Sequence, residues 1–90
     1  MRNLAQLGLR LNKTGLELLR EDRAFLIDIL KHQRTAIQNA ALDDYRLVWL
    51  KAADAEPVEH KKNNAGRRAA NTFMRTVVWP SLSATTNRAA

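Results

Sequence analysis

The feature that most constrains this chain is a proline-free stretch from Thr14 to Asp54, which holds most of the large apolar residues at helical spacing. When the stretch is wound at about 100° per residue, one long band of apolar side chains forms. Its members are Leu16, Leu19, Leu26, Leu30, Ile37, Ala41, Tyr45, Val48 and Ala52. A second band, confined to the first half, consists of Leu18, Phe25, Ile29 and Ala36. Because a helix with two apolar faces needs two packing partners, we expect this stretch to pack against other helices.

The length of this stretch raises the question of a break. Thr14 and Glu17 have the spacing of a capping box, so we expect the helix to begin there. An unbroken helix over residues 15–54 would span roughly 60 Å, which is too long for a compact domain of 90 residues. Either Asp43 caps a new helix after a break near Leu42–Asp43, or the helix is continuous and the protein is elongated. The first band runs on smoothly past Asp43, which slightly favours a continuous helix.

Shorter helical segments flank the central stretch. Residues 2–12 predict a short N-terminal helix, and Pro57 should end the central helix by about Ala55. Residues 65–79 predict a C-terminal amphipathic helix that Pro80 ends. We therefore predict an all-α fold, an irregular hairpin or elongated bundle, with one helical domain over residues 1–80 and a polar tail over residues 81–90.

The positive charge is concentrated at the two ends of the chain. The net charge is +6, and residues 1–14 contribute three basic groups and no acid, whereas residues 15–56 carry a net charge of −2. Residues 57–90 carry six basic groups and one acid. Their densest part brackets Asn-Asn-Ala-Gly, a sequence typical of a loop. We expect this loop to contact nucleic-acid phosphates, DNA or RNA, or an acidic protein subunit, the plainer interpretation being a solvated loop. The predicted contact residues are Lys61, Lys62, Arg67, Arg68 and Arg75.

A protein interface is the second kind of site that the sequence predicts. The second apolar band lacks an obvious partner within so short a chain, and tryptophan often dominates binding energy at interfaces. Trp49 lies off the main apolar band, which makes it the better candidate of the two tryptophans. The predicted interface residues are Leu18, Phe25, Ile29, Trp49 and Trp79, with protein subunits, either copies of this chain or another protein, as partners.

Residues suited to catalysis or metal binding are scarce in this chain. It has no cysteine, two histidines and three scattered glycines, which do not form a zinc site or a phosphate-binding loop. Asp28 and His32 stand one helical turn apart, where an ordinary surface pair is expected. We predict no enzyme, no catalytic residue, no metal and no cofactor.

These observations predict a non-catalytic helical component of a larger assembly, such as a viral or phage particle or a nucleoprotein complex. The alternative is a small phage-type regulator that binds and inhibits a host enzyme or a nucleic-acid-processing complex. The absence of cysteine indicates the cytoplasm or the interior of a virion and excludes a disulfide-dependent secreted protein. No apolar run approaches the roughly 20 residues of a membrane span.

Overall fold

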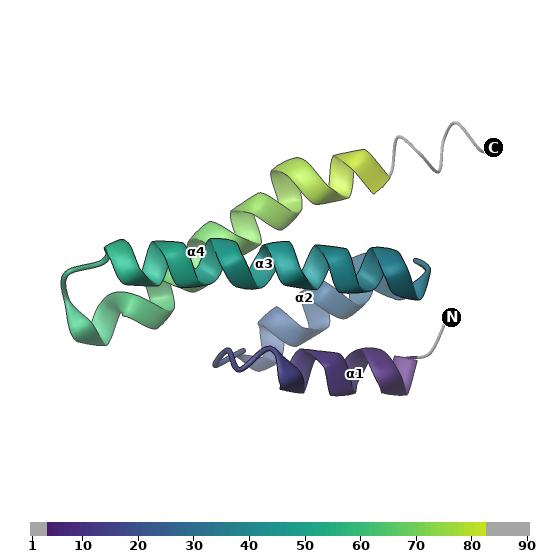
Figure 1. Cartoon of the computed structure of the whole chain (residues 1–90), viewed down its shortest axis with the longest axis horizontal. Coiled ribbons are helices and arrows are strands. Elements are labelled where there is room, and N and C mark those ends of the chain that lie inside the picture. The colour runs from purple at the N-terminus through teal and green to yellow at the C-terminus, as the bar shows by residue number, and fades with distance from the viewer. Residues whose placement is uncertain (1–3, 83–90) are drawn as a thin grey trace.

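In the computed structural model, residues 4–82 are described, and they form helices with no strand among them (Figure 1). The elements are α1 (Leu4–Lys13), α2 (Arg20–Leu30), α3 (Thr35–Ala55), the 3₁₀ turn η1 (Glu59–Lys61), α4 (Lys62–Phe73) and the π-helical segment η2 (Met74–Val78). The helix continues after η2 to residue 82. The predicted all-α fold is confirmed.

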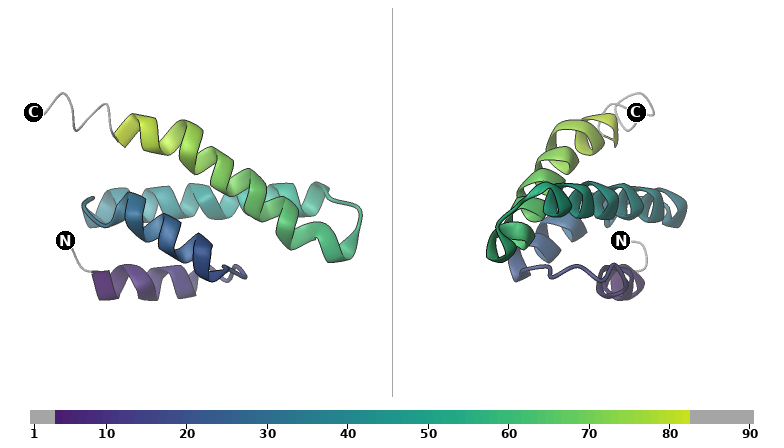
Figure 2. Two further views of the ribbon diagram at one scale, coloured as in Figure 1. Left: turned by 180° about the vertical axis from the view of Figure 1, so that it is seen from behind. Right: turned by 60° about the vertical axis from the view of Figure 1, so that its left-hand side comes forward.

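Helix α3 lies in the middle of the molecule, and the other helices pack around it. Helices α3 and α4 form an antiparallel hairpin, while α1 and the C-terminal helix lie on different sides of α3 (Figures 1 and 2). The radius of gyration is 13.4 Å and the molecule measures 46 × 25 × 19 Å. None of the described helices is both long and apolar enough to cross a membrane.

The predicted helix start at Thr14 is wrong, because Thr14 ends α1 instead. Its hydroxyl donates to the carbonyl of Leu11 at 2.8 Å and accepts the N–H of Leu16 at 3.3 Å. Gly15 follows with φ = 75°, a left-handed conformation that is favoured by glycine at the end of a helix. The chain then runs without helix to Leu19, and α2 begins at Arg20.

The central stretch is broken, but at residues 31–34 and not at the predicted Leu42–Asp43, which lie inside α3. The break is held by Gln38, which is fully buried and whose side-chain amide donates to the carbonyl of Leu30 at 2.9 Å. That carbonyl, at the end of α2, also accepts the backbone N–H of Gln33 at 2.9 Å, so the Gln38 amide is its second donor. A buried polar side chain off the apolar bands therefore helps to hold the turn between α2 and α3.

The core takes buried side chains from α1, α2, α3, α4 and η2, and the most extensive helix contact is between α3 and α4. The largest buried side chains are Trp49, Tyr45, Leu7, Leu11, Leu26, Leu30 and Met74. Gly66 of α4 faces the indole of Trp49, and a Cβ placed on Gly66 would lie 2.5 Å from Trp49 Cδ1. Gly66 stands in a sequence typical of a loop, but it lies inside α4, where the absence of a Cβ lets the Trp49 indole pack directly against the helix backbone.

Pro80 does not end the C-terminal helix, contrary to the prediction. Proline has no N–H, and its ring crowds the carbonyl four residues earlier, here that of Thr76. The preceding turn widens, so that the N–H of Trp79 bonds the carbonyl of Met74, five residues back. The hydroxyl of Thr76 also donates to the carbonyl of Thr72 at 2.8 Å. Residues 83–90 of the predicted tail lie outside the described residues.

We expect Gly66→Ala to destabilise the protein by about 2 kcal/mol, because the buried Trp49 indole has no free space into which to move. Equilibrium unfolding in urea measures the change. Gly8→Ala in α1 is the matched control, since a Cβ there meets no atom within 4 Å. It should raise stability by about 0.5–1 kcal/mol through helix propensity alone. Equal effects of the two substitutions would contradict the proposed contact.

Candidate functional site

A buried polar network of Asp22, Tyr45, Arg67 and Asn71 joins three helices. The carboxylate of Asp22 on α2 is 4% exposed and accepts the Arg67 Nε–H at 2.8 Å and the Asn71 side-chain amide at 3.0 Å, both from α4. It also accepts the backbone N–H of Leu19 at 2.8 Å. Tyr45 of α3 donates its hydroxyl to the side-chain oxygen Oδ1 of Asn71 at 2.7 Å. The network therefore fixes α2 and α3 against α4.

The electrostatics of the network follow from its geometry. Burial by itself raises the pKa of Asp22, but the hydrogen bonds from Arg67, Asn71 and Leu19, with the charge of Arg67, outweigh it and hold the pKa below its ordinary value. Burial, and next the nearby charge of Asp22, raise the pKa of Tyr45. Asp22 is therefore an ionised carboxylate paired with Arg67, and Tyr45 is a neutral donor.

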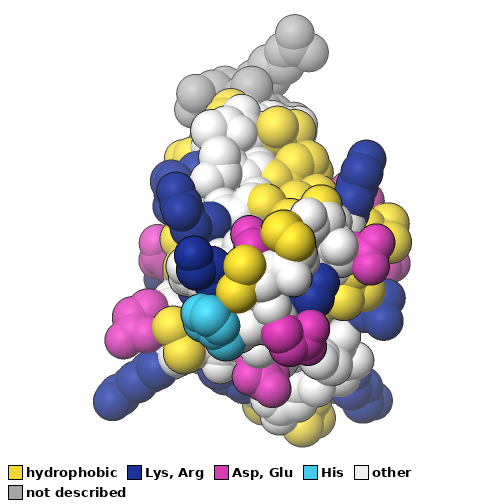
Figure 3. Space-filling view, turned by 90° about the vertical axis from the view of Figure 1, so that its left-hand side faces the viewer, with side chains coloured by type: hydrophobic (Ala, Val, Ile, Leu, Met, Phe, Trp, Pro, Cys, Tyr) yellow, Lys and Arg dark blue, Asp and Glu magenta, His cyan; other side chains and the backbone are white. Residues whose placement is uncertain are grey.

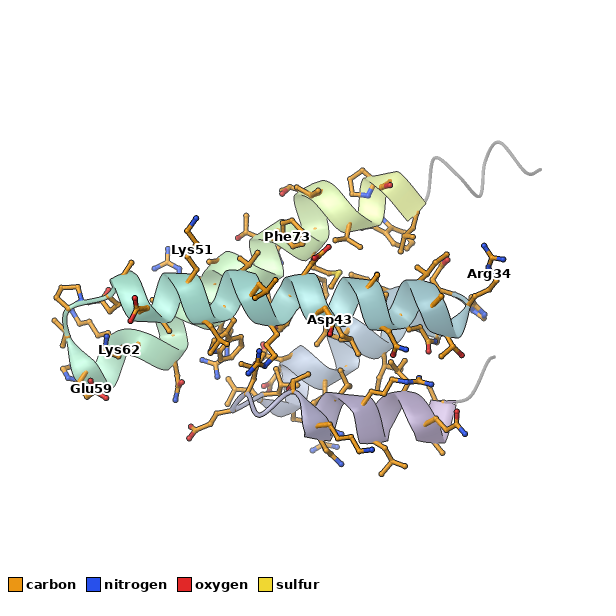
Figure 4. All side chains as sticks on the ribbon, in the orientation of Figure 1. Arg34, Asp43, Lys51, Glu59, Lys62 and Phe73 are labelled. Carbon is orange, nitrogen blue, oxygen red and sulfur yellow. The ribbon has the colours of Figure 1, made fainter. Side chains whose placement is uncertain are left out.

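Two of the residues predicted to contact nucleic acid, Arg67 and Lys62, form hydrogen bonds within the chain instead. Arg67 pairs with Asp22, donates to the carbonyl of Glu17 at 3.0 Å and stacks over Trp49 at 5.2 Å. Lys62 Nζ donates to the carbonyls of Ala53 and Glu56, 3.1 and 2.6 Å away, and so ties the end of α3 to the start of α4 (Figure 4). The predicted basic loop is instead helical in this region, where η1 and α4 lie.

The remaining predicted cations lie in different surroundings. Lys61 and Arg68 are exposed, and within the described residues neither is in an ion pair. Figure 3 shows the hairpin end of the molecule, where basic and acidic side chains are interspersed and do not form a patch of one sign. Arg75 lies elsewhere, with its guanidinium 5.7 Å from the ring centroid of Phe25. The structure therefore does not bring the five predicted cations together.

The structure does bring together three of the predicted interface residues and Arg75. Phe25 and Ile29 of α2, Arg75 of η2 and Trp79 line a surface pocket of about 270 Å³, together with Asp28. We call this the aromatic pocket. Trp79 is 46% exposed, Phe25 is half-buried and Ile29 is 7% exposed. The second apolar band of α2 is thus partly covered by the C-terminal helix of the same chain, and what remains open is concentrated around Trp79.

Of the other two predicted interface residues, Trp49 is not available at the surface. Trp49 is 2% exposed and packs in the core beside Tyr45, with ring centroids 6.0 Å apart. The expectation that Trp49 faces a partner is therefore wrong, because its position off the apolar band points it towards α4. Leu18 is half-buried against the core.

Neither Asp22 nor Gln38 was predicted from the sequence to be an important residue. A signal for Asp22 existed: it stands at the third position of α2, where a carboxylate reaches back to the N–H before the helix. No local signal marked Gln38. Asp28, considered with His32, pairs instead with Lys31 at 3.3 Å.

No cluster of three or more His, Cys, Asp or Glu side chains suited to a metal ion occurs in residues 4–82. No protein-family model, curated protein or solved structure matches this chain. The fold defines its class: a small all-α protein built on an antiparallel helical hairpin.

We expect the protein to lose stability at acid pH through Asp22. Because its pKa is lower in the folded state than its ordinary value of 3.8, the contribution is fully present above about pH 5 and is lost as pH falls through the folded-state pKa. Asp22→Asn should cost about 3 kcal/mol at pH 7 and flatten this acid dependence. Urea unfolding of both proteins between about pH 2 and 7 measures it.

Asp43→Asn is the control for a general charge effect, since Asp43 is exposed and forms no ion pair within the described residues. Its acid profile should follow that of the unchanged protein. An Asp22→Asn protein with the same acid dependence as the unchanged protein would show that another carboxylate is responsible.

Proposed function

We propose that this protein is a non-catalytic helical component of a larger assembly, and that it contacts a neighbouring subunit through the aromatic pocket. The observation that carries the proposal is Trp79, a large aromatic side chain left 46% exposed beside the half-buried Phe25. Burying such a ring in a partner is a common source of binding energy at protein interfaces. An exposed aromatic side chain next to a pocket is more informative than scattered exposed leucines.

The charges around the aromatic pocket favour a second copy of the chain as the partner. The pocket carries one acidic and one basic side chain, Asp28 and Arg75. In a two-fold symmetric contact the same face meets itself, so Arg75 of each copy would approach Asp28 of the other. Opposite charges on one face make that face complementary to itself, and Trp79 of each copy would enter the pocket of the other.

The absence of catalysis is part of the same proposal. Asp22 and Tyr45, whose pKa values are shifted, are explained by the buried polar network, and neither of them lines the aromatic pocket. Shifted pKa values at an active site are expected beside a cleft that admits substrate. These two groups instead hold helices together.

The second candidate function is a regulator that covers an acidic surface of another protein. Lys61 and Arg68, exposed and without an ion pair among residues 4–82, support this role. The same two residues are also the part of the predicted nucleic-acid surface that the fold leaves available.

We expect the purified chain to self-associate, and Trp79→Ala to weaken this association by about tenfold or more, because the ring would lose its place in the partner. Analytical ultracentrifugation over a range of concentrations measures it. Val77→Ala is the matched control: Val77 is 54% exposed on the same segment but does not line the pocket, so association should be unchanged. A chain that stays monomeric up to about 1 mM would contradict self-assembly.

Replacing both Lys61 and Arg68 by alanine separates the roles of the basic residues. If they contact nucleic acid, affinity for a labelled single-stranded oligonucleotide should fall about tenfold for all sequences, with a shallower dependence on salt. Fluorescence anisotropy at two or more salt concentrations measures both quantities. No appreciable oligonucleotide binding by the unchanged chain would instead favour an acidic protein surface as the partner of these residues.

A further inference from the structure

A second pocket, separate from the aromatic pocket, lies between the end of α1 and the middle of α3. Its volume is about 310 Å³, and three cationic side chains line it: Arg10 and Lys13 from α1, and Arg46 from α3. We call it the cationic cleft. These cations are more than 30 positions apart in the sequence at their widest, and the fold brings them to one place.

The two arginines of the cationic cleft are held in place without being neutralised. Arg46 Nε donates to the backbone carbonyl of Thr14 at 3.0 Å, and Arg10 donates to the Gln38 side-chain oxygen at 3.0 Å. The other terminal nitrogen of Arg10 donates to the Gln6 side-chain oxygen at 3.5 Å, and all three acceptors are neutral. Within the described residues, no carboxylate lies within 4 Å of a side-chain nitrogen of Arg10, Lys13 or Arg46. The positive charges are therefore positioned in advance and remain available.

The bond to Thr14 also orients the Arg46 side chain. It occupies Nε, so both terminal Nη groups, which make no hydrogen bond within residues 4–82, stay free to donate. These two groups form the planar fork that binds two oxygens of one phosphate. Lys13 is exposed and makes no hydrogen bond in the same part of the chain, so its ammonium adds a mobile point charge.

We propose that the cationic cleft binds a phosphate group, carried either by a small phosphorylated compound or by a nucleic-acid backbone. Three cations around one cleft suit a ligand with more than one negative charge, which a single carboxylate does not provide. Asp43 also lines the cleft and lowers its positive potential, leaving a net charge of +2 on the lining side chains. The proposal uses none of the residues of the aromatic pocket, so the two can fail separately.

The test is isothermal titration of the full chain with inorganic pyrophosphate at low salt, where electrostatic screening is weakest. The unchanged protein should bind with a dissociation constant below about 1 mM, and Lys13→Ala and Arg46→Gln should each weaken binding about tenfold. The matched control is Lys51→Ala, which removes one charge from the side of α3 that faces away from α1 (Figure 4). Lys51→Ala should leave the affinity within about twofold of the unchanged value, because exposed charges at a distance are screened.

Asp43→Asn provides a change in the opposite direction. It removes the one carboxylate of the cleft and should tighten pyrophosphate binding about threefold or more, a gain that loss of structure does not produce. Circular dichroism of each variant monitors folding. If Arg46→Gln unfolds because its bond to Thr14 is lost, Lys13→Ala and Asp43→Asn still decide the question.

A parallel titration with a short single-stranded oligonucleotide identifies the source of the phosphate. Weaker binding of both ligands by Lys13→Ala would place a nucleic-acid backbone in the cleft, whereas weaker binding of pyrophosphate alone would indicate a small phosphorylated compound. Either result supports the cleft as a phosphate site. Saturable binding of neither ligand, or equal losses in Lys13→Ala and Lys51→Ala, would overturn the proposal.

Discussion

The rest of the structure depends on the burial of one carboxylate, that of Asp22. A buried carboxylate is stable only when other groups supply hydrogen bonds and charge, and here Arg67 and Asn71 of α4 supply them. Asn71 in turn accepts the hydroxyl of Tyr45 from α3, so the network specifies how α4 lies against two other helices. An apolar contact tolerates sliding of one helix along another, whereas two directed hydrogen bonds from α4 to one carboxylate of α2 do not.

This network also changes the meaning of the net charge. A charge of +6 on 90 residues indicates an anionic partner, but the side chains of Arg67 and Lys62 donate hydrogen bonds to groups within the molecule. Of the cations that remain exposed, Lys61 and Arg68 lie at the hairpin, separate from the cationic cleft between α1 and α3. The density of basic residues along the sequence therefore did not predict where positive charge lies on the surface. A long basic side chain donates hydrogen bonds to whichever acceptor the fold places near it.

Sequence periodicity located much of the core and little of the site. Leu26, Leu30, Ala41 and Tyr45 of the predicted long band are all buried, because a helix that packs on others must turn its apolar stripe inward. The same reasoning failed for Trp49, which lies off the stripe yet is buried by α4. Trp79, Phe25 and Ile29 were named from their residue types, but nothing in the sequence placed them around one pocket with Arg75.

The sequence alone determined that the chain is helical, that it lacks thiol chemistry and that Gly, Thr and Pro residues stand where helices could begin or end. It did not determine which effect each of these residues has on a helix. Thr14 and Gly15 end a helix, Gly66 lies within one, and Pro80 is accommodated by a widened turn. Those outcomes, and the meeting of Arg10, Lys13 and Arg46, were decided only in three dimensions. The physical reason is that helix formation depends on residues close together along the chain. Breaks, close approaches and clefts depend on contacts between residues that are far apart in the sequence and meet only when the helices pack.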